Sequence, residues 1–201
     1  MNARAHVLAN VRDAIGARAH GAAEIPRRYR MQTDDGVDTF TARLGHYQSA
    51  WRRVAEGKLE AAVGAALAER GARRVVVPDG IPEAWLDGIE PLRDTPPLDP
   101  HTLDASDGVI TTCAVAIAET GTIVLDASAG MGRRILSLVP DYHLCVVRAD
   151  QIVGSVPQAI AKLDPVRPLT FVSGASATVD IELVRVGGVH GPRTLEVIIA
   201  E

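Results

Sequence analysis

The sequence predicts an α/β fold in which a mostly parallel sheet is flanked by helices and preceded by an N-terminal helical extension. Short β-branched runs appear from residue 73 onward and recur to the end of the chain. Helical segments alternate with several of these runs, which is typical of parallel strands joined by crossover helices. Before residue 73 the apolar residues recur at helical spacing instead. We therefore expect a helical extension over residues 1–55 and an α/β domain over residues 56–201.

Three helices are expected before the first strand. The first covers residues 3–19, because Val7, Val11 and Ile15 share one helical face. The second carries a longer apolar stripe, made up of Val37, Phe40, Leu44, Tyr47 and Trp51. The third covers residues 57–70 and ends at Gly71, the residue type that most often terminates a helix. Residues 20–35 have no periodicity and are expected to be a linker.

The strands are expected where β-branched residues form short runs bounded by turn residues. These runs cover residues 73–77, 107–112, 122–125, 144–148, 169–172 and 194–200. Helical segments are expected over residues 133–139 and 151–163. The segment 88–106 is rich in Pro and Asp and is expected to be a loop.

The composition excludes several classes of protein. The net charge of −4 and the aromatic content of 3% argue against a nucleic-acid-binding protein. No apolar run approaches the length of a membrane span. Cys113 and Cys145 lie in apolar stretches without a CxxC motif, so the chain has too few ligands for an iron–sulfur or zinc centre. We expect a cytoplasmic bacterial protein with no cofactor and no metal site; its Arg-rich start resembles a transit peptide, but a basic surface helix is favoured.

Four glycine-punctuated polar clusters lie at the edges of apolar runs, where an α/β sheet binds ligands. The first cluster is Glu119-Thr120-Gly121-Thr122. A carboxylate beside a glycine turn can act as a base, a nucleophile or a hydroxyl acceptor. The alternative is a turn carboxylate that caps nearby amides. Glu119 is a candidate catalytic residue, and Thr120 and Gly121 are candidate ligand contacts.

The second cluster, Gly130-Met131-Gly132-Arg133-Arg134, precedes an expected helix. Glycines at a helix start expose backbone N–H groups that favour an anion, and Arg133 can clamp a carboxylate or phosphate. Gly130, Gly132 and Arg133 are therefore candidate anion contacts; the alternative is a tight turn with solvated arginines. A dinucleotide fingerprint is disfavoured because Ile135 stands where its third glycine is needed.

The third cluster is Ser173-Gly174-Ala175-Ser176, which leaves a strand and is expected to enter a helical turn. Ser173, Gly174, Ser176 and the following Asp180 are candidate anion or ligand contacts. Capping is the alternative for the two serines, and a hydrolase nucleophile elbow is incomplete because Thr178 replaces its second glycine. Asp180 and Glu182 without a positioned His do not indicate a metal site.

The fourth cluster, Gly187-Gly188-Val189-His190-Gly191-Pro192, holds a histidine in a rigid loop. Histidine exchanges protons near neutral pH, so His190 is a candidate catalytic residue. The alternative is a histidine that ties the loop to a carbonyl. His143, which precedes an expected strand, is an intermediate case, and the other histidines are expected at the surface.

The clusters together resemble the lactate utilization protein C family, whose domain is called LUD. The motifs that carry the resemblance are, in order, Ala116-Ile117-Ala118-Glu119-Thr120-Gly121-Thr122, Gly132-Arg133, Pro140-Asp141-Tyr142-His143, Ser173-Gly174-Ala175-Ser176 with Asp180-Ile181-Glu182, and Gly188-Val189-His190-Gly191-Pro192. The resemblance is specific over residues 107–201. It implies a fold similar to the NagB/RpiA/CoA-transferase group and a role with iron–sulfur companion proteins in oxidising L-lactate to pyruvate. It supplies no assigned nucleophile or cofactor.

Three hypotheses on function remain open from the sequence. The favoured one is a subunit of a lactate oxidation system in which Glu119, Arg133 and His190 contact the substrate or a partner's cofactor. The second is a stand-alone transferase or isomerase acting on a CoA thioester or sugar phosphate, with Glu119 as nucleophile or base. The third is a non-catalytic assembly or regulatory protein. The expected partners are the iron–sulfur subunits and possible copies of the chain itself, without nucleic acid or membrane.

Overall fold

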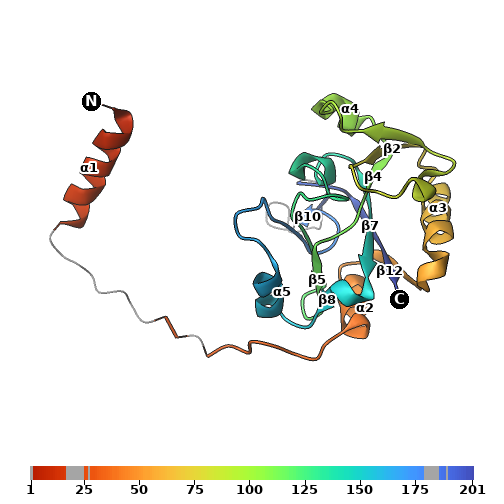
Figure 1. Ribbon diagram of the computed structural model, residues 1–201, viewed down its shortest axis with the longest axis horizontal. Coiled ribbons are helices and arrows are strands. Elements are labelled where there is room, and N and C mark those ends of the chain that lie inside the picture. Colours follow the sequence, from red (N-terminus) through yellow and green to blue (C-terminus); the bar gives the residue numbers. More distant parts are fainter. Residues whose placement is uncertain (1, 17–24, 27, 179–185, 189) are drawn as a thin grey trace. The chain divides into compact units, whose positions relative to one another are not determined.

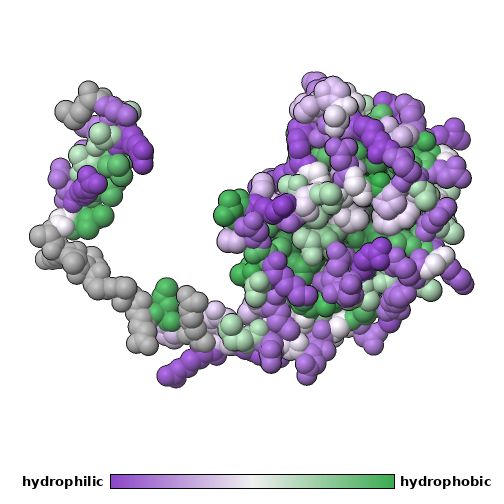
Figure 2. All heavy atoms as spheres, viewed as in Figure 1, coloured by the Kyte–Doolittle hydropathy of each residue, from purple (hydrophilic) through white to green (hydrophobic). Residues whose placement is uncertain are grey.

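The computed structural model describes residues 2–16, 25–26, 28–178, 186–188 and 190–201, in two compact units. The first unit, Met1–Arg30, contains helix α1 (Ala3–Ile15), which begins where the Asn2 side chain accepts a hydrogen bond from the Arg4 N–H. None of its described residues is buried, and Figure 2 shows apolar side chains along the helix. Within the described residues, no helix has the length and apolarity needed to cross a membrane.

The second unit, Met31–Glu201, is built on a central sheet in which every strand is parallel to its neighbours (Figure 1). In spatial order the strands are β1 (Ala50–Val54), β12 (Thr194–Ala200), β7 (Tyr142–Arg148), β4 (Gly108–Thr111), β2 (Arg74–Val77) and β3 (Glu90–Arg93). The inner strands β12, β7, β4 and β2 are β-branched runs that are almost entirely buried, as parallel sheets require, whereas the edge strands β1 and β3 are partly exposed. The predicted α/β fold with a mostly parallel sheet is confirmed.

A second, mixed sheet accompanies the first. Its strands, in spatial order, are β8 (Ile152–Val153), β5 (Val115–Ile117), β6 (Thr122–Leu125) and β9 (Thr170–Val172). Strand β6 runs antiparallel to both β5 and β9. Strand β9 stands at one end of this order and is therefore an edge strand. A short antiparallel pair, β10 (Ala177–Thr178) with β11 (Val186–Gly187), follows β9. The prediction of a helical turn after Ser176 is therefore wrong, because the chain continues in an extended conformation into β10.

The core fills the spaces between successive layers. Helix α3 (Leu59–Arg70) packs on one side of the central sheet, together with the short helix η2 (Glu83–Leu86), and η1 (Glu56–Lys58) leads into α3. The second sheet and helix α2 (Val37–His46) pack on the other side. Helix α5 (Val156–Lys162) then covers the outer face of the second sheet, as Figure 1 shows.

The expected second helix is too long. Helix α2 ends at His46, because Gln48 adopts a left-handed backbone (φ 58°) that turns the chain into β1. Phe40 and Leu44 are fully buried against the second side of the central sheet, whereas Trp51 lies in β1 and is exposed. Helix α2 and strand β1 fall within the expected extension of residues 1–55, but they pack into the unit Met31–Glu201.

Three further segments differ from expectation. The expected loop 88–106 contains strand β3 and helix α4 (Pro100–Asp104), whose N-terminus is capped by Asp99. The expected helix 133–139 is the short 3-10 helix η3 (Arg134–Ser137). The expected helix 151–163 begins with η4 (Ala149–Gln151) and β8 and becomes helical only in α5. The third expected helix is confirmed, with Gly71 in a left-handed C-cap.

Candidate functional site

Several predicted site residues line one cavity of about 270 Å³ in the second unit. Ser173, Gly174, Ser176 and His190 surround it, and His143 joins them from β7. The cavity lies between edge strand β9 with its following loop and the amino-terminal ends of β7 and β12. The third and fourth clusters therefore meet, although they lie at separate places in the sequence.

His143 forms the buried floor of this cavity. Only 1% of the residue is exposed, and its Nε2 lies 2.7 Å from the Thr111 Oγ1 of the neighbouring strand β4. Burial lowers the pKa of His143 to about 4, so the imidazole is neutral at physiological pH. Among the described residues, the bond to Thr111 is the only hydrogen bond of the ring, and Nδ1 has no partner.

A chain of three hydroxyl groups connects the first cluster to the cavity. The Ser173 Oγ lies 2.7 Å from the Thr122 Oγ1, which in turn lies 2.7 Å from the Thr120 Oγ1. Thr122 is buried, and each hydroxyl can donate or accept. Thr120 therefore acts on the cavity through its neighbours, by orienting the Ser173 hydroxyl.

Ser176 ties down the loop that carries His190. Its Oγ accepts a hydrogen bond from the His190 N–H at 3.0 Å, and its own N–H donates to the Pro192 carbonyl at 2.8 Å. The backbone of His190 is thus anchored while its exposed side chain lines the cavity. His190 also borders an adjoining cavity of about 540 Å³, where Arg193 pairs with Asp141.

The loop after β9 presents backbone donors to the cavity. Within the described part of the chain, the N–H groups of Gly174 and Ala175 have no hydrogen-bond partner. Gly174 adopts a positive φ of 87°, and its Cα packs so close to Tyr47 that a side chain there would overlap the ring. Successive backbone N–H groups in such a bend can bind an anion. These two N–H groups are therefore candidate donors to an anion.

Glu119 lies away from the cavity that the third and fourth clusters line. Its Oε1 accepts a hydrogen bond from the Val156 N–H at 2.7 Å, at the first residue of α5, and it does not line the 270 Å³ cavity. This contact agrees with the capping alternative. Gly121 lets the turn pack on α2, because a Cβ on its left-handed backbone would lie 2.5 Å from the Arg43 Cβ.

Replacing Glu119 separates capping from catalysis. We expect Glu119→Ala to lower the free energy of unfolding by about 1 kcal/mol, because the Val156 N–H at the start of α5 loses its acceptor. Glu119→Gln keeps an acceptor oxygen and should retain most of that stability, which chemical denaturation measures. If Glu119 is instead a base or nucleophile, Glu119→Gln abolishes activity while leaving stability unchanged.

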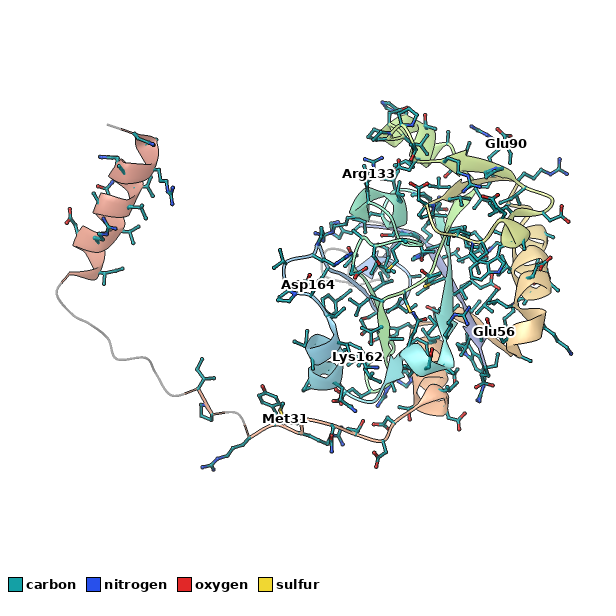
Figure 3. The ribbon with its side chains drawn as sticks, in the orientation of Figure 1. Met31, Glu56, Glu90, Arg133, Lys162 and Asp164 are labelled. Carbon is teal, nitrogen blue, oxygen red and sulfur yellow. The ribbon has the colours of Figure 1, made fainter. Side chains whose placement is uncertain are left out.

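The second cluster lies at another cavity, of about 440 Å³, beyond the carboxyl ends of β2 and β3. The Arg133 guanidinium binds both oxygens of Asp94, at 2.6 and 2.7 Å, and also the Leu98 carbonyl. This pairing lowers the pKa of Asp94. Arg133, labelled in Figure 3 beside η3, is thus held by a carboxylate of its own chain and forms no clamp at the first cavity.

The glycines of the second cluster serve close packing. The Gly130 N–H donates to the Asp79 carbonyl at 2.6 Å, and the Gly130 carbonyl accepts from the Thr112 N–H. Gly132 packs against Pro78. The cluster therefore closes the carboxyl edge of the central sheet, and Arg133 is paired with Asp94 where it borders the 440 Å³ cavity.

Asp180, a candidate ligand contact, and the possible metal ligands remain to be placed. Asp180 and Glu182 lie outside the described residues. Among the residues that are described, no three His, Cys, Asp or Glu side chains are grouped to hold a metal ion. Cys113 and Cys145 are buried free thiols, and burial raises the pKa of both.

Comparisons with known proteins identify the family. A sequence model of the LUD domain matches residues 101–200. The lactate utilization protein C of Deinococcus radiodurans is 47% identical over 203 residues, which cover 98% of this chain and 95% of that protein. The chain belongs to the lactate utilization protein C family. A crystal structure of a DUF162 family protein from Deinococcus radiodurans has a TM-score of 0.71, with 47% identity over 82% of this chain and 95% of that one.

Other members align over shorter stretches. The uncharacterized protein YkgG of Escherichia coli is 39% identical over 84 residues, or 38% of this chain and 36% of that protein. The lactate utilization protein C of Shouchella clausii is 35% identical over 99 residues, or 44% of this chain and 42% of that protein. These relatives confirm the resemblance read from the sequence motifs.

Proposed function

We propose that this chain is a cytoplasmic subunit of a system that oxidises L-lactate to pyruvate, together with iron–sulfur partner proteins and without a cluster or other cofactor of its own. Relatives from Deinococcus radiodurans and Shouchella clausii are named for lactate utilization. The observation that carries the proposal is the 270 Å³ cavity, which lies just below the ~300–1,000 Å³ range of sites for drug-sized ligands. Such a space suits a small acid.

The residues around the cavity supply distinct interactions for such an acid. The N–H groups of Gly174 and Ala175 and the hydroxyl of Ser173 bind the carboxylate. Oxidation of L-lactate to pyruvate releases two electrons and two protons. The iron–sulfur partners would accept the two electrons. His190, at the exposed rim, accepts one proton and returns it to solvent, and the second proton passes directly to solvent water.

Deletion of the gene in its host tests the function. We expect growth on L-lactate to be lost and to return when the intact chain is supplied, whereas growth on a sugar is unaffected. Affinity purification of the tagged chain should recover the iron–sulfur partners. Unimpaired growth on lactate, with no such complex, would rule the proposal out.

Replacing His190 tests its role in the reaction. We expect His190→Gln to slow lactate oxidation by the assembled system by about a hundredfold, the lower end of the effect of general acid–base groups. Its anchor to Ser176 uses only the backbone N–H, so folding and partner binding should persist. An undiminished rate would favour a non-catalytic assembly role for the chain.

A further inference from the structure

The Thr111–His143 pair is not explained by packing alone. Both residues are essentially fully buried, and His143 lines the cavity whereas Thr111 does not. Their mutual bond of 2.7 Å satisfies one ring nitrogen. In the described structure the other nitrogen, Nδ1, has no hydrogen-bond partner in the protein, so it is available to a ligand in the cavity that His143 lines.

We propose that His143 recognises the oxygen on C2 of the bound acid through Nδ1, and that Thr111 lets this one imidazole serve either a hydroxyl or a carbonyl. The inference deepens the proposed function and rests on it, because that function makes L-lactate and pyruvate the two ligands. These acids share a carboxylate and a methyl group and differ only at the C2 oxygen.

The hydroxyl of Thr111 allows both arrangements because it can donate or accept. When Thr111 donates to Nε2, the proton of the neutral ring resides on Nδ1, which then donates to the carbonyl of pyruvate. When Nε2–H donates to Thr111, Nδ1 is bare and accepts a hydrogen bond from the hydroxyl of lactate.

In the second arrangement Thr111 turns its own proton away from the ring. Cys145, the residue opposite Thr111 across the β4–β7 pair, is a buried thiol that donates to the Thr112 carbonyl at 3.7 Å, and its sulfur is a weak acceptor. The buried imidazole stays neutral, so both arrangements carry the same charge. Exchange between them therefore requires no charge to enter the interior.

Calorimetric titration of the full chain with L-lactate, pyruvate and propionate tests whether His143 recognises the C2 oxygen. Propionate lacks the C2 oxygen and leaves Nδ1 unpaired, so we expect it to bind at least about fivefold more weakly than the other two, the value of one hydrogen bond. Equal binding of all three acids, or binding of none, would overturn the inference.

Two substitutions form a matched pair. His143→Gln keeps a polar group near the Nε2 position, facing Thr111, and loses the one at Nδ1; we expect it to bind all three acids equally. His143→Asn keeps a polar group near the Nδ1 position and should retain the preference against propionate. The reverse pattern would show that the Thr111 contact, and not Nδ1, governs recognition.

Nitrogen-15 NMR of the labelled wild-type chain tests, without a substitution, whether the His143 ring changes tautomer between the two acids. The ring nitrogen shifts of His143 should report the Nδ1–H tautomer with pyruvate and the Nε2–H tautomer with L-lactate. The same tautomer in both complexes would contradict the role of Thr111. These results are independent of growth on lactate: growth judges the proposed function, whereas acid preference and tautomer judge His143.

Discussion

Lowering the pH from 6.5 to 4 is expected to remove about 3 kcal/mol from the free energy of unfolding, because His143 is buried as a neutral imidazole. Its pKa falls from an ordinary value of 6.5 to about 4 in the folded protein. Between these values the unfolded chain binds a proton that the folded chain does not, so stability falls as pH falls. Each pH unit in this window costs about 1.4 kcal/mol, and the loss stops below pH 4.

Urea denaturation at pH 7, 5.5 and 4 measures this dependence. We expect His143→Gln to flatten the profile between pH 6.5 and 4, and His190→Gln, at the exposed rim, to leave it in place. Asp94, Asp107 and Asp141 have pKa values below the usual 3.8, so the stability that they contribute is lost at lower pH. Equal slopes in the wild type and His143→Gln would contradict the assignment.

The α/β class could be predicted because strand and helix periods are local properties of the sequence. The division of the strands between two sheets could not. Residues 108–111 and 122–125 are similar short apolar runs, and both are buried, yet the first lies in the central sheet and the second in the mixed sheet. Partner choice depends on the whole chain path, which a single run does not encode.

The site could be predicted only in part, because its assembly also depends on the path of the whole chain. Ser173, Ser176 and His190 meet at one cavity, but Arg133 is paired with Asp94, in a segment expected to be a loop. A glycine beside a charged residue has the same local pattern in a ligand site, a helix cap and an ion pair. His143 carried a usable signal, since a buried polar residue in an apolar strand is informative. Its partner Thr111 is visible only once β4 and β7 are neighbours.

Replacing Arg52 is expected to destabilise the fold by about 3 kcal/mol, because it leaves a buried carboxylate without its cation. Glu196 of β12 is 5% exposed and accepts hydrogen bonds from Arg52 at 2.6 Å and from the Tyr142 hydroxyl at 2.9 Å. Arg52→Met fills the space of the methylene stem but removes the charge. Chemical denaturation at pH 7 measures the loss.

Two comparisons separate the buried charge from lost packing. Adding Glu196→Gln to Arg52→Met should restore most of the stability, because a neutral amide needs no cation and still accepts from Tyr142. The exposed pair Arg193–Asp141 has a similar distance of 2.7 Å, yet Arg193→Met should cost much less stability than Arg52→Met because solvent screens both charges. Similar losses for Arg52→Met and Arg193→Met would show that burial of Glu196 does not govern the effect. Failure of Glu196→Gln to rescue would assign the loss to the Arg52 stem and its contact with Glu69.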